Sequence, residues 1–279
     1  MKIVPDTKIL VTGAASGIGR ATSLALADRG ARLAVTDIRG PGLEETAAMI
    51  KSRGGRVLSS RALDISCFEE VKAFAAEVHR DHGAVDILMN IAGISVWSLV
   101  ENMTHDHWVR VINTNLWGPI HGIECFVPEM IKAGRGHVVT VSSISGLLGL
   151  PWHGAYAASK YGCVGLSEVL RYDLRQHNIG VTVVCPGAVE TPLKNTVELL
   201  GVDQDAESVK ALKRRFSQRA IPPEKVARQI LKAVETGRFL VITSFDVRLM
   251  YFLKRYLPPA YHRLLLYASR LLNSVAVAA

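Results

Sequence analysis

Short runs of β-branched and aliphatic residues alternate with amphipathic stretches along most of the chain. The runs predict seven strands, at 8–12, 32–36, 57–63, 85–89, 136–143, 180–187 and 238–243. The stretches between them predict helices, among them 44–53, 68–82, one that begins at Thr104, one that carries Tyr156 and one that begins near Pro222. Alternating strands and helices are typical of a parallel sheet with helices on both faces. The pattern therefore predicts an α/β fold with a doubly wound, seven-stranded parallel sheet.

After the seventh predicted strand the pattern changes to two amphipathic helices separated by Pro258-Pro259. The first places its apolar side chains on one side, opposite Arg248 and Arg255 and with Lys254 at the boundary: Leu249, Met250, Phe252, Leu253, Tyr256 and Leu257. The second has an apolar face made of Tyr261, Leu264, Leu265, Ala268, Leu271 and Leu272. We therefore predict a domain at residues 1–245 that contains the sheet and a basic amphipathic helical tail at residues 246–279.

Charged residues are distributed unevenly along the chain, and this distribution gives information about binding partners rather than about the fold. Residues 1–200 contain 19 basic and 19 acidic side chains, whereas residues 201–279 contain 14 and 6, which accounts for the net charge of +8. No window reaches the ~18 uncharged apolar residues that a spanning helix needs. Two alternatives stay open for the tail: it lies on a membrane surface, or it packs on the body or a partner subunit and covers a pocket.

The cysteines and the N-terminal residues indicate the cellular compartment in which the protein is expected. The four cysteines are far apart and form no C-x-x-C pair, which argues against a zinc site or a disulfide framework and favours a reducing cytosol. The first residues turn polar too soon for a signal peptide. We expect a cytoplasmic protein, with peripheral contact to a membrane as the alternative. His105 and His107 could suggest a metal site, but the sequence near them offers no third ligand, so we expect no bound metal.

A glycine-rich loop joins the first predicted strand to a helix: Gly13-Ala-Ala-Ser16-Gly17-Ile18-Gly19. Glycines there permit a tight turn and close approach of the backbone, and the helix N-terminus attracts a pyrophosphate. Asp37 ends the second strand, about 20 residues later, where a carboxylate accepts hydrogen bonds from ribose hydroxyls and repels a 2′-phosphate. Arg39 could bind such a phosphate, but the glycine loop carries no basic residue, so we expect NAD rather than NADP.

Tyr156 and Lys160 lie four residues apart in a predicted helix, so their side chains share one face. A free phenol has a pKa of ~10 and exchanges protons poorly at neutral pH. A lysine ammonium held close favours the phenolate, which suits general acid–base catalysis. Helices also carry this spacing by chance, and the alternative for the pair alone is a surface tyrosine over a solvated lysine.

Taken together, these motifs resemble the short-chain dehydrogenase/reductase family, over residues 5–245 and in the family's order. The matching elements are Thr12–Gly19, Asp64, Asn90-Ile-Ala-Gly93, Asn115, Ser143, Tyr156 with Lys160, and Pro186-Gly-Ala-Val189-Glu-Thr191. The resemblance implies a Rossmann-type fold and cofactor contacts from Gly13, Ser16, Gly17, Ile18, Gly19, Asp37, Asp64, Ile65, Asn90, Ala92, Gly93, Tyr156, Lys160, Pro186, Val189 and Thr191. Isoleucine at the second position of Asn90–Gly93 and the long tail depart from the family pattern.

The resemblance also implies a reaction, the reversible transfer of hydride between a carbinol carbon and NAD. Tyr156 would exchange the hydroxyl proton, and Lys160 would assist it and bind the nicotinamide ribose. Ser143 would donate a hydrogen bond to the substrate oxygen. Asn115 would hold a water between Lys160 and solvent.

Three segments are expected to line the substrate pocket, 94–99, 145–155 and 189–200. They supply Trp97, Leu147, Leu148, Leu150, Trp152, Leu193 and Leu199, with Ser145 and His153 as polar groups. Such a lining favours a lipophilic secondary alcohol or ketone of steroid, retinoid or acyl type. Alternatives are a reductase of small polar carbonyls and a non-catalytic dinucleotide sensor or scaffold.

The expected assembly is a homodimer or homotetramer, formed through the helices that carry Asn115 and Tyr156. No nucleic-acid partner is expected, because the tail's aromatic residues lie among aliphatic ones rather than on a basic face.

Overall fold

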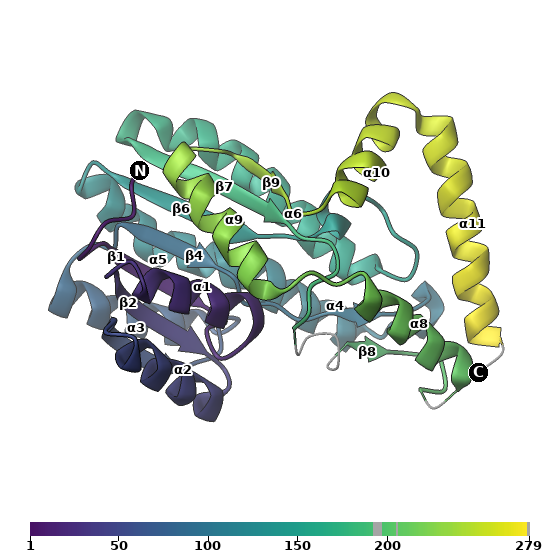
Figure 1. The fold of residues 1–279 in the computed structure, drawn as a ribbon, viewed down its shortest axis with the longest axis horizontal. Helices are drawn as coiled ribbons and strands as arrows, with labels where there is room; N and C mark the ends of the chain where they lie inside the picture. Colours follow the sequence, from purple (N-terminus) through teal and green to yellow (C-terminus); the bar gives the residue numbers. More distant parts are fainter. Residues whose placement is uncertain (192–196, 205, 278–279) are drawn as a thin grey trace.

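A seven-stranded parallel sheet forms the centre of the protein, and its strand order is β3-β2-β1-β4-β6-β7-β9 (Figure 1). The computed structural model describes residues 1–191, 197–204 and 206–277. The strands are β1 (Lys8–Thr12), β2 (Arg32–Asp37), β3 (Arg56–Ala62), β4 (Ile87–Asn90), β6 (Gly136–Val141), β7 (Ile179–Cys185) and β9 (Leu240–Ile242). The predicted doubly wound α/β fold is thus confirmed.

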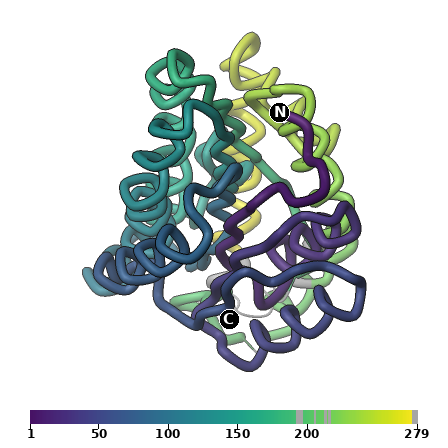
Figure 2. Tube along the Cα trace, turned by 90° about the vertical axis from the view of Figure 1, so that its left-hand side faces the viewer, coloured from purple at the N-terminus to yellow at the C-terminus, as the bar shows by residue number. Residues whose placement is uncertain are grey.

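Helices cover both faces of this sheet, as the end-on view in Figure 2 shows. One layer contains α1 (Gly17–Ala27), α2 (Gly40–Ser52) and α9 (Pro223–Thr236). The other contains α3 (Phe68–His82), α5 (Gly118–Lys132) and α6 (Gly154–Asp173), the last followed by a short turn η4 (Arg175–His177). Successive strand residues point to opposite faces. Accordingly Ile9 and Val11 pack in the first layer, whereas Leu10 packs with Phe74 in the second.

The predicted helix from Thr104 is interrupted. It comprises α4 (His105–Ile112), a π-helical turn η2 (Asn113–Trp117) and α5. The Thr104 hydroxyl accepts from the backbone N–H of His107, and a His107 ring nitrogen accepts from the backbone N–H of Thr104 at 3.1 Å. His107 therefore caps a helix, and the described residues contain no group of three potential metal ligands.

A second, two-stranded sheet lies beside the carboxyl ends of the main strands and was not predicted. It pairs β5 (Val96–Trp97) with β8 (Glu198–Leu199). The short turns η1 (Val100–Asn102) and η3 (Ile144–Gly146) and the helix α8 (Glu207–Gln218) complete this side of the molecule.

The C-terminal tail forms two helices, α10 (Phe245–Tyr256) and α11 (Pro258–Val277), at one end of the molecule (Figure 1). The side of α10 that packs on the body carries Val247, Met250 and Tyr251 rather than the whole predicted face. Four members of that face are exposed by 47–63 %: Leu249, Phe252, Tyr256 and Leu257. Apolar residues surround most of α10, so periodicity alone does not show which stripe packs. No helix among the described residues has both the length and the apolarity to cross a membrane.

Candidate active site

The glycine loop lies where the strand order reverses, between the carboxyl ends of β1 and β4. Gly13 has φ +73°, a conformation that disfavours side chains. A Cβ on Gly19 would lie 2.0 Å from the Gly13 carbonyl oxygen. Thr12 Oγ1 accepts from the backbone N–H groups of Ile91 and Ala92 at 3.0 and 3.2 Å, which ties the loop after β4 to the loop after β1. The backbone is therefore shaped for close approach of a ligand at the start of α1.

Asp37 closes one end of this cleft. Its carboxylate is buried and accepts from the backbone N–H of Ala15 at 3.0 Å and of Arg39 at 2.9 Å. The Arg39 guanidinium contacts the hydroxyl of Ser16 across the cleft. A carboxylate fixed at the end of β2 suits ribose hydroxyls, and an arginine stands next to it.

A cleft of about 450 Å³ runs along these strand ends. Most of the predicted cofactor residues line it: Gly13, Ser16, Gly17, Ile18, Gly19, Asp37, Asp64, Ile65, Ala92, Gly93 and Thr191. Six further residues line it that were not predicted as cofactor contacts: Ile38, Leu63, Ile91, Ile94, Arg110 and Thr114. Several of these directly follow or adjoin motif residues, which could have indicated them. Arg110 and Thr114 reach the cleft only through the folding of α4 and η2.

Five predicted cofactor residues are not part of that lining: Tyr156 and Lys160, described below, and three more, Asn90, Pro186 and Val189. The Asn90 amide is buried and donates to the carbonyl of Pro119 at 3.4 Å, so it packs on α5. The Pro186 carbonyl accepts from the backbone N–H of Ile144 at 2.7 Å. Val189 is buried and forms an isolated bridge with Ile221. In this structure all three support the loops around the cleft.

The four predicted catalytic residues lie next to this cleft rather than in its lining, and Asn115 and Lys160 approach Gly93 of the lining. Ser143, Tyr156 and Lys160 are buried, at 7, 9 and 4 % exposure, and Lys160 Nζ lies 5.8 Å from the Tyr156 ring centroid. Lys160 Nζ donates to the carbonyl of Val141 at 3.0 Å, which orients the ammonium at the end of β6. Ser143 Oγ accepts from the backbone N–H of Ser145 at 3.1 Å.

Asn115 lies in the π-helical turn and is fully buried. Its Oδ1 accepts from the backbone N–H of Ile94 at 2.8 Å, and its Nδ2 donates to the Ile94 carbonyl at 2.9 Å and to Ser159 Oγ at 3.2 Å. A Cβ on Gly93 would lie 2.9 Å from Asn115 Oδ1 and 3.3 Å from Lys160 Nζ. Asn115 therefore holds the loop after β4 against the helix that carries Tyr156.

The structure joins the three segments that were predicted to line the substrate pocket. The Ser98 backbone N–H donates to the Trp152 carbonyl at 2.8 Å, and that of Leu200 donates to the Trp97 carbonyl at 3.1 Å. The side chains of Leu147, Leu148, Trp152, Leu199 and Ser145 are buried, and those of Trp97, Leu150 and His153 are partly buried. Leu193 lies outside the described residues.

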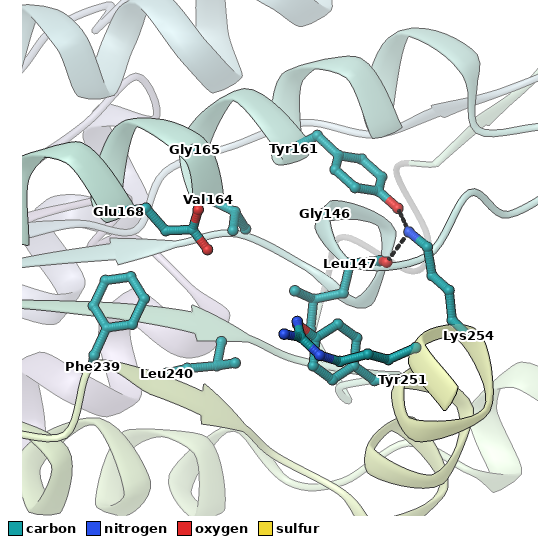
Figure 3. A pocket seen from close by; sticks show the side chains of 11 residues that line it. Gly146, Leu147, Tyr161, Val164, Gly165, Glu168, Phe239, Leu240, Tyr251 and Lys254 are labelled. Atoms are coloured by element: carbon teal, nitrogen blue, oxygen red, sulfur yellow. Dashed lines mark hydrogen bonds between the residues drawn. The ribbon is translucent and has the colours of Figure 1, made fainter. Parts of the chain in front are cut away.

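A second cavity, of about 390 Å³, lies between α6, β9 and α10 (Figure 3). At its edge the Lys254 ammonium donates to the Leu147 carbonyl at 2.7 Å and contacts the Tyr161 hydroxyl. Leu147 ends the short turn that follows Ser143. One helix of the tail is therefore tied to the loop beside the catalytic residues.

The fold and the site together define an oxidoreductase of the dinucleotide-binding α/β class. A family model described as short chain dehydrogenase matches residues 7–199. The chain belongs to the short-chain dehydrogenase/reductase family.

Three relatives illustrate this membership. The oxidoreductase SadH of Mycobacterium tuberculosis is 32% identical over 257 residues, which cover 91% of this chain and 92% of SadH. The oxidoreductase EphD of the same organism is 34% identical over 260 residues, but this chain spans only 44% of EphD's length. A short-chain dehydrogenase/reductase from Burkholderia phymatum, crystallised in complex with NAD, has a TM-score of 0.82 at 28% identity and matches over 91% of this chain and 95% of its own.

Proposed function

We propose that the protein is an NAD(H)-dependent dehydrogenase that interconverts lipophilic secondary alcohols and ketones. The observation that carries this proposal is that buried Ser143, Tyr156 and Lys160 lie next to a cleft lined by the glycine loop and Asp37, with Lys160 close to Gly93 of that lining. The glycine backbone at the start of α1 and the carboxylate of Asp37 fit its pyrophosphate and a ribose. A bound nicotinamide would supply the hydride acceptor or donor.

In the oxidation direction, Tyr156 accepts the substrate hydroxyl proton as the carbinol carbon gives up hydride. The Lys160 ammonium, oriented by the carbonyl of Val141, stabilises negative charge on the phenol oxygen. Ser143 donates its hydroxyl proton in a hydrogen bond to the substrate oxygen while its lone pairs accept from Ser145. Asn115 has a positioning role: its amide is hydrogen-bonded to Ile94 and Ser159, so it holds the loop after β4 against the helix that carries Tyr156.

The substitution Tyr156→Phe tests the chemistry. It removes only the phenol oxygen, so turnover should fall by at least about 100-fold, the range of general acid–base catalysis, while the Kd for NAD changes little. The measurements are steady-state kinetics and a fluorescence titration with NAD. Turnover near the wild-type rate would contradict the assigned proton transfer.

The substrate class rests on the apolar side chains around the catalytic residues. Leu147, Leu148, Trp152 and Leu199 are buried in the segments predicted to line the pocket, although Leu147 and Leu148 pack mainly with Val183 and Cys185 of β7. Few polar groups accompany them, and such sites favour apolar ligands. A panel of steroid, retinoid, aryl and polyol alcohols, ranked by kcat/KM, tests the class. A preference for polyols or small polar carbonyls would contradict it.

We further infer a homodimer or homotetramer built on the helices near Asn115 and Tyr156. Trp117 of η2 and Val169 and Tyr172 of α6 are exposed by 48, 56 and 70 % in the single chain. Large apolar side chains gathered on neighbouring helices are typical of subunit interfaces. Light scattering at micromolar concentration should give a multiple of the 30.4 kDa chain mass; a monomer mass would contradict this.

For the tail we propose contact with an anionic membrane surface. The stripe Phe245, Leu249, Phe252 and Tyr256 is exposed along α10, at the i, i+4, i+7, i+11 positions of one face. Residues 244–279 carry five basic side chains and the single acid Asp246, which complements anionic lipid. The full chain, and a variant ending at Ser244 as the control, would be sedimented with anionic liposomes at low salt. Full-length protein that stays in the supernatant would instead favour the tail as a lid on the body or on a partner subunit.

A further inference from the structure

His153 lies at the N-terminal end of α6, three residues before Tyr156. Its ring centroid is 6.1 Å from that of Tyr156 and 4.6 Å from that of Trp97. The His153 ring is partly buried and lies between Tyr156 and Trp97 of the small sheet of β5 and β8. The mechanism proposed above leaves it without a role.

The protonation of the His153 ring follows from its neighbours. Nδ1 lies 2.7 Å from the carbonyl oxygen of Pro151, and a carbonyl oxygen can only accept, so Nδ1 carries the proton. Burial lowers the pKa of His153 to about 4, which keeps the ring neutral at physiological pH. In that tautomer Nε2 is a hydrogen-bond acceptor with a free lone pair.

Within the described part of the chain, no hydrogen-bond donor lies within bonding distance of this Nε2. The ring neighbours of His153 are the aromatic side chains of Trp97 and Tyr156, and buried Leu199 pairs with Trp97 in the small sheet. An acceptor left unpaired when an apolar ligand excludes water costs free energy. A ligand that carries a matching donor avoids that cost, and sites built this way discriminate strongly against analogues without the donor.

We propose that His153 determines substrate specificity by accepting a hydrogen bond at Nε2 from a second hydroxyl or N–H group of the substrate, a few bonds from the reacting carbon. The inference rests on the proposed function and deepens it. The substrate class becomes lipophilic hydroxyketones and the corresponding diols, or their amino analogues, rather than simple ketones.

Three ketones test this in the holoenzyme with NADH: acetophenone, α-hydroxyacetophenone and α-methoxyacetophenone. The methoxy compound matches the hydroxyl compound in size and electron withdrawal but has no donor. The wild-type kcat/KM should be about 10-fold higher for the hydroxyketone than for either other ketone, as expected for one neutral hydrogen bond. Because each ratio is taken within one protein, a loss of folded enzyme cancels.

Two variants separate the acceptor from the shape of the ring. His153→Phe keeps an aromatic ring against Trp97 but removes the acceptor, so the three ketones should become nearly equal. His153→Gln retains an acceptor oxygen and should keep a preference for the hydroxyketone. Equal kcat/KM values in the wild type, or a preference that survives in His153→Phe, would overturn the inference and leave the proposed function standing. Turnover of none of the three ketones would refute both.

Discussion

We expect the choice between NAD and NADP to depend on one buried carboxylate, and the substitution Asp37→Ala tests this. Asp37 is held at the end of β2 by the backbone N–H groups of Ala15 and Arg39. Hydrogen bonds from ribose hydroxyls to a carboxylate contribute about 1.5–3 kcal/mol. Their loss should raise the Kd for NAD by about 10- to 100-fold, since each 1.4 kcal/mol is a factor of ten.

The same substitution should have the opposite effect on NADP. Two unit charges 4 Å apart repel each other by about 1 kcal/mol in water and about 4 kcal/mol near a protein surface. Removing the carboxylate takes that repulsion away and leaves Arg39, which reaches Ser16 across the cleft, beside a 2′-phosphate. The Kd for NADP should therefore fall at least about 5-fold.

The assay is a fluorescence titration of each protein with both dinucleotides. Asp37→Asn is the matched control, because its amide oxygen can still accept from Ala15 while the charge is gone. In the double variant Asp37→Ala, Arg39→Ala the gain in NADP affinity should be smaller, because the attraction of the guanidinium is lost. A wild-type protein that binds NADP more tightly than NAD, or a ratio of Kd values that Asp37→Ala leaves unchanged, would refute the reasoning.

Three further predictions concern stability and the pocket. His137 is 1 % exposed, and burial lowers its pKa to about 4, so the unfolded chain binds more protons than the folded one between about pH 4 and 6.5. The free energy of unfolding, measured by urea denaturation, should therefore fall by up to about 3 kcal/mol as pH drops through that window. The fall should be smaller in His137→Gln, which has no group that titrates there. Lys254→Met keeps the apolar stem but removes the hydrogen bond to the active-site loop, so KM should rise with the Kd for NAD unchanged, whereas the exposed Arg255→Met should behave as wild type. Asn115→Ala leaves both backbone groups of Ile94 unpaired and should lower Tm by several degrees and reduce kcat; a kcat equal to wild type would contradict its positioning role.

Most of the main sheet is predictable because its determinants are local. Runs such as Lys8–Thr12 are apolar on both faces, which only a strand buried between two helical layers satisfies. The glycine loop is predictable for a similar reason, since the φ of +73° at Gly13 and the 2.0 Å approach at Gly19 exclude side chains. The convergence of Ser143, Tyr156 and Lys160 follows from the resemblance, because no local pattern shows that a strand end and a helix meet.

Other features depend on contacts between distant residues. The pairing of Trp97 with Leu199 joins segments about a hundred positions apart, and neither strand is long enough to produce a periodic pattern. The π-helical turn at Asn113–Trp117 appears in the sequence only as polar residues within a helix. The hydrogen bond from His153 to Pro151, which decides its tautomer, also needs the folded loop.

The tail is joined to the substrate side of the molecule at two separate points. Lys254 of α10 binds the carbonyl of Leu147, and Trp152 Nε1 donates to Oδ1 of Asn273 in α11 at 3.1 Å. Both body partners, Leu147 and Trp152, lie within the stretch that leads from Ser143 to the helix of Tyr156. If the proposed membrane contact covers the exposed stripe of the tail, we expect it also to stabilise one arrangement of that stretch. Because coupled binding equilibria are reciprocal, a substrate that orders the stretch would then strengthen the tail's contact by the same factor, and sedimentation with anionic liposomes with and without substrate would measure it.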